Sequence, residues 1–506
     1  MKKLSMGLAF VLALGSISEG AEQRAPIVSS GPGIYKHRFD PQKVTVVNNG
    51  LAALKLRLDM IESAKQSIEM EYFIYSIDTA GRLITQALIR KAKQGVKVRV
   101  IVDTSLPIFE LNKYYAAVLK ESGIQVHYYN EAWIIQVVST QFRSHRKSLI
   151  VDGQKAITGG RNIADEYFDL SPDYNFMDTD MYVEGTIARD MRASFEEFWT
   201  ADITKPALDV LEPRPEEYYG LSKDNLDDWF TLQDEETKKS LDRYKSDLYF
   251  YNKGMNKARV FTVTTDEDLR TLEKVNNEGA VLLARETTDY CNDMIYAADF
   301  PGMGEKTRVL RKQLAKEAVM ARSEVDIESP YFVIKKEISD VLQRLLNRNV
   351  KINVLTNSLY STDAFYTQAA FDTRISVWTK AGVNVWMHSG ERDPQTYPVT
   401  GIAENARWGT HSKRAVIDGK TSIVGTFNMD PRSTNLNAEM ALICRDNEVI
   451  AHSIQQDMRN RISNGIKLGL NGRTEDGQVV RKQSPFSKKV LFWLSMPLAN
   501  LFDFLL

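Results

Sequence analysis

The chain has 506 residues, which is enough for two domains of ordinary size or for one domain built from a duplicated unit. Its 65 Lys and Arg residues nearly balance its 66 Asp and Glu residues, so no global positive field is available to hold a long nucleic acid. This disfavours a nuclease. The two cysteines, Cys291 and Cys444, are too few for a disulfide framework or a thiolate metal cluster.

The first twenty residues resemble a secretory signal in composition. Two lysines precede an uncharged apolar run over residues 4–17, and small residues follow it. The run is shorter than the roughly 20 residues that a membrane-spanning helix needs. We therefore expect residues 1–20 to be a signal peptide or, alternatively, an uncleaved N-terminal anchor, and the rest of the chain to be exported across a membrane.

Four sequence blocks recur in the same order in the two halves of the chain. They pair SIEMEYFIY (67–75) with VDIESPYFV (325–333), KQGVKVRVIVD (93–103) with NRNVKINVLTN (347–357), LKESGIQVHYY (119–129) with WTKAGVNVWMH (378–388), and HRKSLIVDGQKAITGGRN (145–162) with HSKRAVIDGKTSIVGTFN (411–428). The early blocks predict strands, and helical patterns such as RLITQALIRKAKQ lie between them. Strand, helix and strand in this order predict parallel pairing, so each half is expected to be an α/β unit whose sheet is covered by helices.

The repeat also defines the expected domains. The first repeated domain spans residues 21–204 and the second spans 301–470. Between them, residues 205–300 are rich in charge and have no counterpart in the repeat, which indicates an insertion. Residues 471–506 are expected to form a polar linker and an apolar tail.

The apolar tail follows Lys488 and Lys489 and reads VLFWLSMPLANLFDFLL. Pro497 and Asp503 interrupt it, so it is too short and too broken to span a membrane. Its aromatic residues suit a segment in the headgroup region of a membrane surface, with the two lysines facing anionic lipid. The alternative is a helix docked on the body of the protein.

The last repeated block predicts a hairpin that carries functional groups. Strand alternation places His145 and Lys147 on one face and Asp152 on the other, and the second copy repeats this with His411, Lys413 and Asp418. Each Asp is followed by Gly, a pair favoured in tight hairpin turns. The returning strands end near Asn162 and Asn428, so each hairpin is expected to bring His, Lys and Asn together, while the two Asp residues are structural.

These residue types suit the transfer of a phosphodiester group. Lysine supplies positive charge and asparagine a neutral N–H for the non-bridging oxygens. A neutral imidazole can attack phosphorus, while a second, protonated imidazole can donate a proton to the leaving alkoxide. Two hairpins facing one another would supply both histidines, so we expect one active site shared by the halves.

The pattern His-x-Lys, four residues, Asp, six residues, then Gly-small-x-Asn resembles the phospholipase D superfamily. Both copies fit it, with Gly160 and Thr426 where that family usually has serine. The resemblance implies two pseudo-symmetric phospholipase D-like α/β/α units packed face to face around one shared active site. It also implies a phosphohistidine intermediate and no metal or cofactor. By analogy with the family we expect His145 to be the nucleophile and His411 the acid, and the pseudo-symmetry leaves the reverse assignment open.

In the same family a carboxylate after each motif holds the catalytic histidine through its other ring nitrogen. Asp178 and Glu439 match those places, and Asp180 is a close rival of Asp178. Such a partner fixes the tautomer and raises the basicity of the imidazole.

The segments GGRNIADEYFD (159–169), LTNSLYSTD (355–363) and GTFNMDPRSTNLNAEMALI (425–443) resemble bacterial cardiolipin synthases, most closely the cardiolipin synthase C subgroup. This implies transfer of a phosphatidyl group from phosphatidylglycerol or phosphatidylethanolamine to phosphatidylglycerol, by an exported, membrane-associated protein on the periplasmic side of a bacterial cell envelope. Its expected partners are phospholipids and the membrane surface, and nucleic acid is not expected. The sequence leaves open which protein, if any, is a partner. The alternatives are a phospholipase D that uses water as acceptor, a nuclease, and an inactive membrane scaffold, against which both intact motifs argue.

Overall fold

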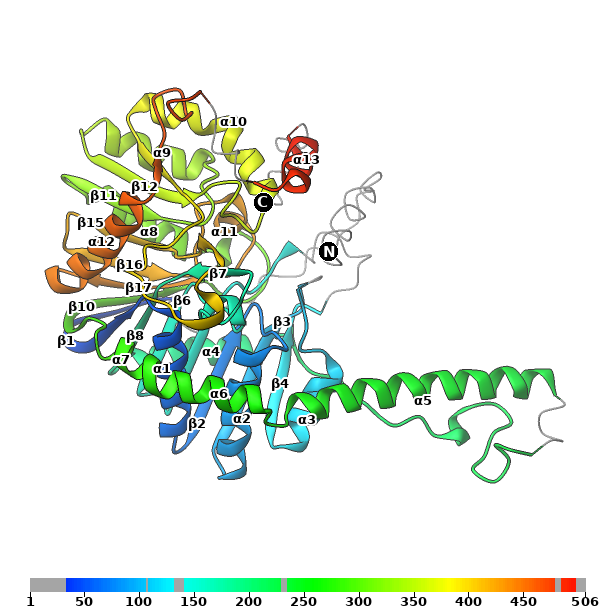
Figure 1. Cartoon of the computed structure of the whole chain (residues 1–506). Helices are drawn as coiled ribbons and strands as arrows, with labels where there is room; N and C mark the ends of the chain where they lie inside the picture. Colours follow the sequence, from blue (N-terminus) through cyan, green and yellow to red (C-terminus); the bar gives the residue numbers. More distant parts are fainter. Residues whose placement is uncertain (1–32, 106–107, 132–140, 229–233, 478–483, 497–506) are drawn as a thin grey trace.

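The computed structural model describes residues 33–105, 108–131, 141–228, 234–477 and 484–496 (Figure 1). The predicted signal segment, residues 1–20, and the last ten residues of the apolar tail lie outside the described residues.

One mixed sheet of 16 described strands runs through both halves of the chain, in the order β18-β13-β12-β11-β15-β16-β17-β10-β1-β8-β6-β5-β2-β3-β4-β9. The strands of the first half are β1 (Ile34–Val47), β2 (Ser67–Tyr72), β3 (Lys97–Asp103), β4 (Ile124–Tyr129), β5 (Ser148–Val151), β6 (Lys155–Gly159), β8 (Asp180–Glu184) and β9 (Thr204–Pro206). Those of the second half are β10 (Thr288–Ala298), β11 (Glu324–Glu328), β12 (Lys351–Asn357), β13 (Asn384–His388), β15 (Arg414–Ile417), β16 (Thr421–Gly425), β17 (Met440–Arg445) and β18 (Ile466–Lys467). A separate short sheet pairs β7 (Tyr174–Met177) with β14 (Arg407–Thr410).

The sheet has an internal twofold pattern. Outward from β1 the order is β8-β6-β5-β2-β3-β4-β9, and outward from β10 the equivalent strands follow in the same order. β1 and β10 pair with each other antiparallel, so the pseudo-twofold axis lies between them. In both halves the first three repeated strands pair parallel, as predicted. The predicted α/β fold of two pseudo-symmetric units is confirmed, and the two units share a continuous sheet.

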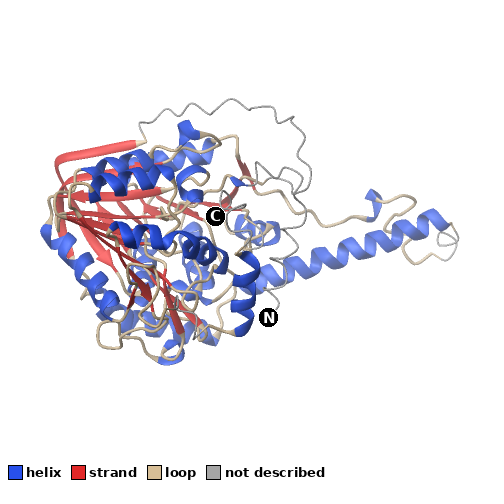
Figure 2. Cartoon of the chain, turned by 90° about the horizontal axis from the view of Figure 1, so that it is seen from above, coloured by secondary structure: helices blue, strands red, loops and turns tan. Residues whose placement is uncertain are grey.

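Helices cover both faces of this sheet (Figure 2). Those of the first half are α1 (Gly50–Ser63), α2 (Thr79–Lys93), α3 (Lys113–Glu121) and α4 (Ile187–Thr200), and those of the second half are α8 (Leu310–Val319), α9 (Lys336–Leu346), α10 (Phe365–Ala381), α11 (Pro431–Asn435) and α12 (Glu448–Ser463). α1, α2 and α3 pack their apolar residues in one core, and α8, α9 and α10 do so in another. α4 and α12 share a third core on the opposite face, beneath the central strands. The layers are therefore α/β/α.

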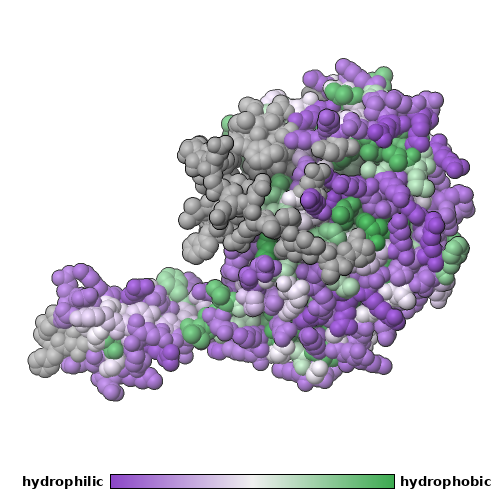
Figure 3. Space-filling model, turned by 180° about the vertical axis from the view of Figure 1, so that it is seen from behind, coloured by the Kyte–Doolittle hydropathy of each residue, from purple (hydrophilic) through white to green (hydrophobic). Residues whose placement is uncertain are grey.

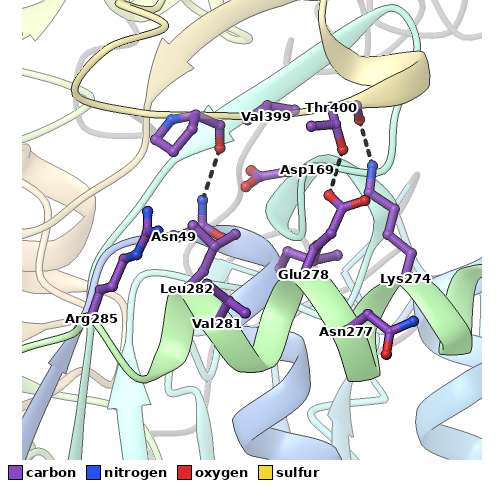
Figure 4. Close-up of a pocket in the computed structure, with 12 residues that line it drawn as sticks. Asn49, Asp169, Lys274, Asn277, Glu278, Val281, Leu282, Arg285, Val399 and Thr400 are labelled. Atoms are coloured by element: carbon purple, nitrogen blue, oxygen red, sulfur yellow. Dashed lines mark hydrogen bonds between the residues drawn. The ribbon is translucent and has the colours of Figure 1, made fainter.

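The segment without a counterpart in the repeat has two parts. α5 (Glu235–Phe261) projects from the body and its surface is mainly hydrophilic (Figures 1 and 3). α6 (Asp266–Lys274) returns along α2 and α7 (Ala280–Leu283) along α1, and the segment then continues into β10 at the centre of the sheet. A cavity of about 400 Å3 lies where this return meets the loop at 398–400 (Figure 4). There Lys274 and Glu278 both hydrogen-bond Thr400, at 2.5 Å each, so the segment contacts both halves.

A disulfide joins Cys291 in β10 to Cys444 in β17, two neighbouring strands. Both cysteines are fully buried. The sequence did not predict this bond, because two cysteines 153 residues apart carry no spacing signal. A stable buried disulfide is typical of proteins that fold in an oxidising compartment.

The described part of the tail, α13 (Phe486–Ser495), docks on α10. Phe492 is buried there against Val333 and Leu359. Lys488 donates to the backbone carbonyls of Tyr360 and Thr362, so the expectation that it faces lipid is wrong. Phe486 and Trp493 remain exposed. None of the described helices is long and apolar enough to cross a membrane.

Candidate active site

The hairpins β5–β6 and β15–β16 carry the two His-Lys motifs, and an Asp-Gly turn closes each of them. In both turns Asp and Gly have positive φ angles between 52° and 66°, a conformation that favours Gly and Asp over most residues. The Asp152 carboxylate accepts the backbone N–H groups of residues 65–67, at 2.7–2.9 Å. Asp418 accepts those of residues 322–324 in the same way. These carboxylates fasten each hairpin to the neighbouring strand.

The histidine of each half is held by the carboxylate of the other half. His145 Nδ1 lies 2.9 Å from Glu439 Oε2, and His411 Nδ1 lies 2.8 Å from Asp178 Oδ2. All four residues are buried, with at most 6% of each exposed. The two motifs therefore combine in one place, and the carboxylate beside each histidine comes from the other half. Lys413 Nζ, of the same half, also lies 2.8 Å from His411 Nδ1.

Short parallel pairings explain this crossing. The His411 N–H donates to the Met177 carbonyl at 2.9 Å, where β14 pairs with β7. In the symmetric position the His145 N–H donates to the Ala438 carbonyl, also at 2.9 Å, beside an isolated parallel bridge. Met177 directly precedes Asp178, and Ala438 directly precedes Glu439. Each of these backbone hydrogen bonds therefore brings a carboxylate next to the histidine of the other half.

Two further polar residues at equivalent strand ends support these positions. Asp103, at the end of β3, accepts the N–H of Ser144 at 2.8 Å. Asn357, at the end of β12, accepts the N–H of Thr410 at 2.9 Å. The sequence analysis missed both residues, although they occupy the same last position of a repeated block.

The two histidine–carboxylate pairs differ in their surroundings. Glu439 also accepts hydrogen bonds from Thr426 (2.5 Å), Ser433 (2.7 Å) and Asn437 (3.3 Å). Asp178 packs on Gly160, where an added Cβ would come within 2.1 Å of Oδ1. The residues that replace the usual serine, Thr426 and Gly160, therefore each contact one of the carboxylates.

The lysines lie beside their own histidines. Lys147 Nζ donates to the His145 carbonyl at 2.8 Å, and Lys413 Nζ donates to the His411 carbonyl at 2.5 Å. Both ammonium groups are buried. Burial, and then the charge of Lys413, lower the pKa of Lys147 well below its usual value. The charges of the two lysines therefore act on each other within one site.

The asparagines are buried in both halves. Asn162 accepts the Ile74 N–H at 3.3 Å and donates to the Tyr167 hydroxyl at 2.9 Å. The Asn428 side-chain oxygen has no hydrogen-bond partner among the described residues. Asp180, the rival of Asp178, contacts neither histidine; it pairs with Arg57 at 2.8 Å and Arg161 at 3.2 Å.

Burial lowers the pKa of His145 and of His411 to about 4, so both imidazoles are neutral at pH 7. Burial alone would raise the pKa of Asp178, but the hydrogen bond from His411 and the nearby positive charges of Lys413 and Arg161 together lower it, so the carboxyl is ionised. Burial also lowers the pKa of Lys413, to about 8. Across the described ranges, no group of three or more His, Cys, Asp or Glu side chains is placed to hold a metal ion.

The chain matches the cardiolipin synthase PLD-like domain over residues 58–199 and again over 314–461, which together are more than half of its length. It belongs to this family. Cardiolipin synthase C of Escherichia coli K12 is 27% identical over 426 residues, covering 81% of this chain and 82% of that protein. Cardiolipin synthase 1 of Bacillus anthracis is 25% identical over 436 residues, covering 85% and 69%.

A solved phosphatidylserine synthase from Haemophilus influenzae Rd KW20 has a similar fold to this PLD-like family member, with a TM-score of 0.61. The two chains are 13% identical, and the match covers 92% of this chain and 97% of the other. At this identity the similarity concerns the fold alone.

Proposed function

We propose that the protein is a phosphatidyltransferase most similar to the cardiolipin synthase C subgroup. It would move a phosphatidyl group from phosphatidylglycerol or phosphatidylethanolamine to the free hydroxyl of a second phosphatidylglycerol. The observation that carries this proposal is the pair of crossed histidine–carboxylate contacts, which surround two buried lysines with two neutral imidazoles. One diester replaces another, so no nucleotide is consumed.

In the first step His145 attacks phosphorus through Nε2, while its Nδ1–H stays on Glu439. His411 is neutral in the free protein, so it first takes up a proton from solvent as the anionic phosphate binds beside it. A P–N bond then forms, the P–O bond to the headgroup breaks, and the protonated His411 gives its proton to the leaving alkoxide. Lys147, Lys413 and the two asparagines would stabilise the charge on the non-bridging oxygens. In the second step His411 takes the proton of the acceptor hydroxyl, whose oxygen attacks phosphorus and releases His145.

The hydrogen bonds of the two carboxylates support this division of roles. Glu439 shares its negative charge with three donors besides His145, which favours the neutral imidazole that a nucleophile needs. The side chain of Asp178 accepts, besides the His411 bond, the N–H of Thr179. Asp178 therefore has fewer competing donors than Glu439 and is free to stabilise a protonated His411, while the charge of Lys413, 2.8 Å from His411 Nδ1, acts in the opposite direction until the phosphate binds.

We propose that the protein acts on the periplasmic side of a bacterial cell envelope, at the membrane surface. The buried disulfide supports export to an oxidising compartment, in agreement with the signal-like start of the sequence. The exposed Phe486 and Trp493 of α13 supply aromatic side chains that suit a lipid headgroup region.

The test is to incubate the protein with phosphatidylglycerol vesicles, with and without phosphatidylethanolamine, and to identify the lipid products by mass. We expect cardiolipin, and dependence of its yield on phosphatidylethanolamine would name the donor. Phosphatidic acid as the sole product would instead show a phospholipase D that uses water. If neither forms, the lipid assignment is wrong.

A further inference from the structure

A cavity of about 330 Å3 lies between α8, α9 and the sheet in the second half. Its wall is mainly apolar and includes Leu314, Ala318, Ile338, Leu342, Ile417 and Phe427. Lys413 of the active site also lines it, and so do Arg311 and Lys312 of α8. An apolar space therefore borders a cation that faces the reacting phosphate.

Strand alternation makes the cavity continuous with the active site. Lys413, Ala415 and Ile417 share one face of the strand that begins the second hairpin, and all three line the cavity. The apolar wall thus begins two residues beyond the catalytic lysine.

Among the described residues of the first half, larger side chains occupy the place that corresponds to this cavity. The last turns of α1 and α8 are equivalent, because Ala64 N–H bonds to the Ile61 carbonyl as Ala321 N–H does to the Ala318 carbonyl. This equivalence places Ala315 and Ala318 where the first half has Leu58 and Ile61. Leu58 and Ile61 are larger than these alanines, and both are buried in the core of the first half.

A buried ionic cluster fills the rest of the equivalent space. In the first half Asp180 pairs with Arg57 and Arg161. The corresponding residues of the second half are apolar and all line the cavity: Ala441, Leu314 and Phe427. The second half therefore has neither the bulk nor the charge that the first half has at these equivalent positions.

We propose that this cavity receives an acyl chain of the phosphatidyl group that is transferred. The inference rests on the proposed function, because it places the lipid's phosphate at Lys413. An empty apolar cavity excludes water and readily takes up hydrocarbon. Because the described residues at the equivalent place of the first half are larger or charged, the two lipids of the reaction would be held differently in a site that is otherwise nearly symmetric.

The test refills the cavity with the residues of the first half, in the double variant Ala315→Leu/Ala318→Ile. We compare kcat/KM for dipalmitoyl- and dihexanoyl-phosphatidylglycerol in detergent micelles. The long-chain to short-chain ratio should fall by roughly tenfold or more in the variant. Ala381→Leu, which adds similar bulk at the exposed end of α10, should leave the ratio unchanged. If the double variant does not fold, the single variant Ala318→Val replaces it in the same assay, and a fall in its long-chain to short-chain ratio is again the expected result.

An unchanged ratio in a folded variant would overturn the inference while leaving the proposed function in place. If the wild-type protein turns over neither lipid, the proposed function fails, and photolabelling with a diazirine-bearing palmitoyl phosphatidylglycerol decides about the cavity. Label within residues 310–346 that disappears in the double variant supports the acyl site. Label confined to other parts of the chain contradicts it.

Discussion

Burial keeps His145 and His411 neutral in the free protein, so each needs a nearby negative charge when it takes up a proton. Glu439 and Asp178 supply that charge from the opposite half. A contact of this kind also fixes the ring so that Nε2 points to the substrate. At the scale of single residues, we therefore expect the carboxylates to contribute to turnover through the histidines that they contact.

We expect Asp178→Asn and Glu439→Gln each to lower kcat by on the order of 100- to 10,000-fold, because the amide no longer stabilises an imidazolium. Circular dichroism should show a folded protein, since the substitutions keep the side-chain shape. The matched control is Asp173→Asn, which replaces an exposed carboxylate directly before β7, the strand that Asp178 follows. If one of these amide variants turns over substrate at the wild-type rate, the carboxylate that it replaces has no part in the reaction.

The buried lysines predict a pH dependence. Lys413, with a pKa of about 8, is charged below that pH and loses its charge as the pH rises through it. In the proposed reaction this ammonium stabilises the non-bridging oxygens. Because kcat/KM reports titrations of the free protein, kcat/KM should fall above about pH 8. A profile of kcat/KM from pH 6 to 10 checks this, and a flat alkaline limb would contradict it.

At the scale of elements, the repeated hairpin could be predicted because its signals are local. Alternation set the face of His145 and Lys147, and the Asp-Gly pair predicted the turn. The crossed contacts could not be predicted, because they depend on parallel pairing between segments such as Thr410 and Met177, which lie 233 positions apart. The same holds for the disulfide, whose cysteines only become neighbours when β10 enters the centre of the sheet.

The Cys291–Cys444 disulfide should contribute to stability by linking two strands near the pseudo-twofold axis. We expect Cys291→Ser, or reduction of the wild type, to lower the free energy of unfolding by about 2–5 kcal/mol. Chemical denaturation with and without reductant measures the change, and Cys291→Ser should not respond to reductant. Equal stability of oxidised and reduced protein would argue against a structural role.

At the scale of the whole molecule, the halves share one sheet through β1 and β10 and exchange their carboxylates across it. The sequence predicted two equivalent units and one shared site. It could not predict that a continuous sheet joins them, because the joining strands, Ile34–Val47 and Thr288–Ala298, fall outside the repeated blocks. Nor could it show that the units differ in an apolar cavity, which depends on small residues whose neighbours are known only from the fold.

The central claim is that the two motifs form one site, and the kinetics of His145→Asn, His411→Asn and the double variant test it most directly. If both histidines act in one reaction, each single variant should lose about as much phosphodiester transfer as the double variant, on the order of 10,000-fold or more. Two independent sites would instead leave each single variant with about half of the wild-type rate. That result would contradict the account.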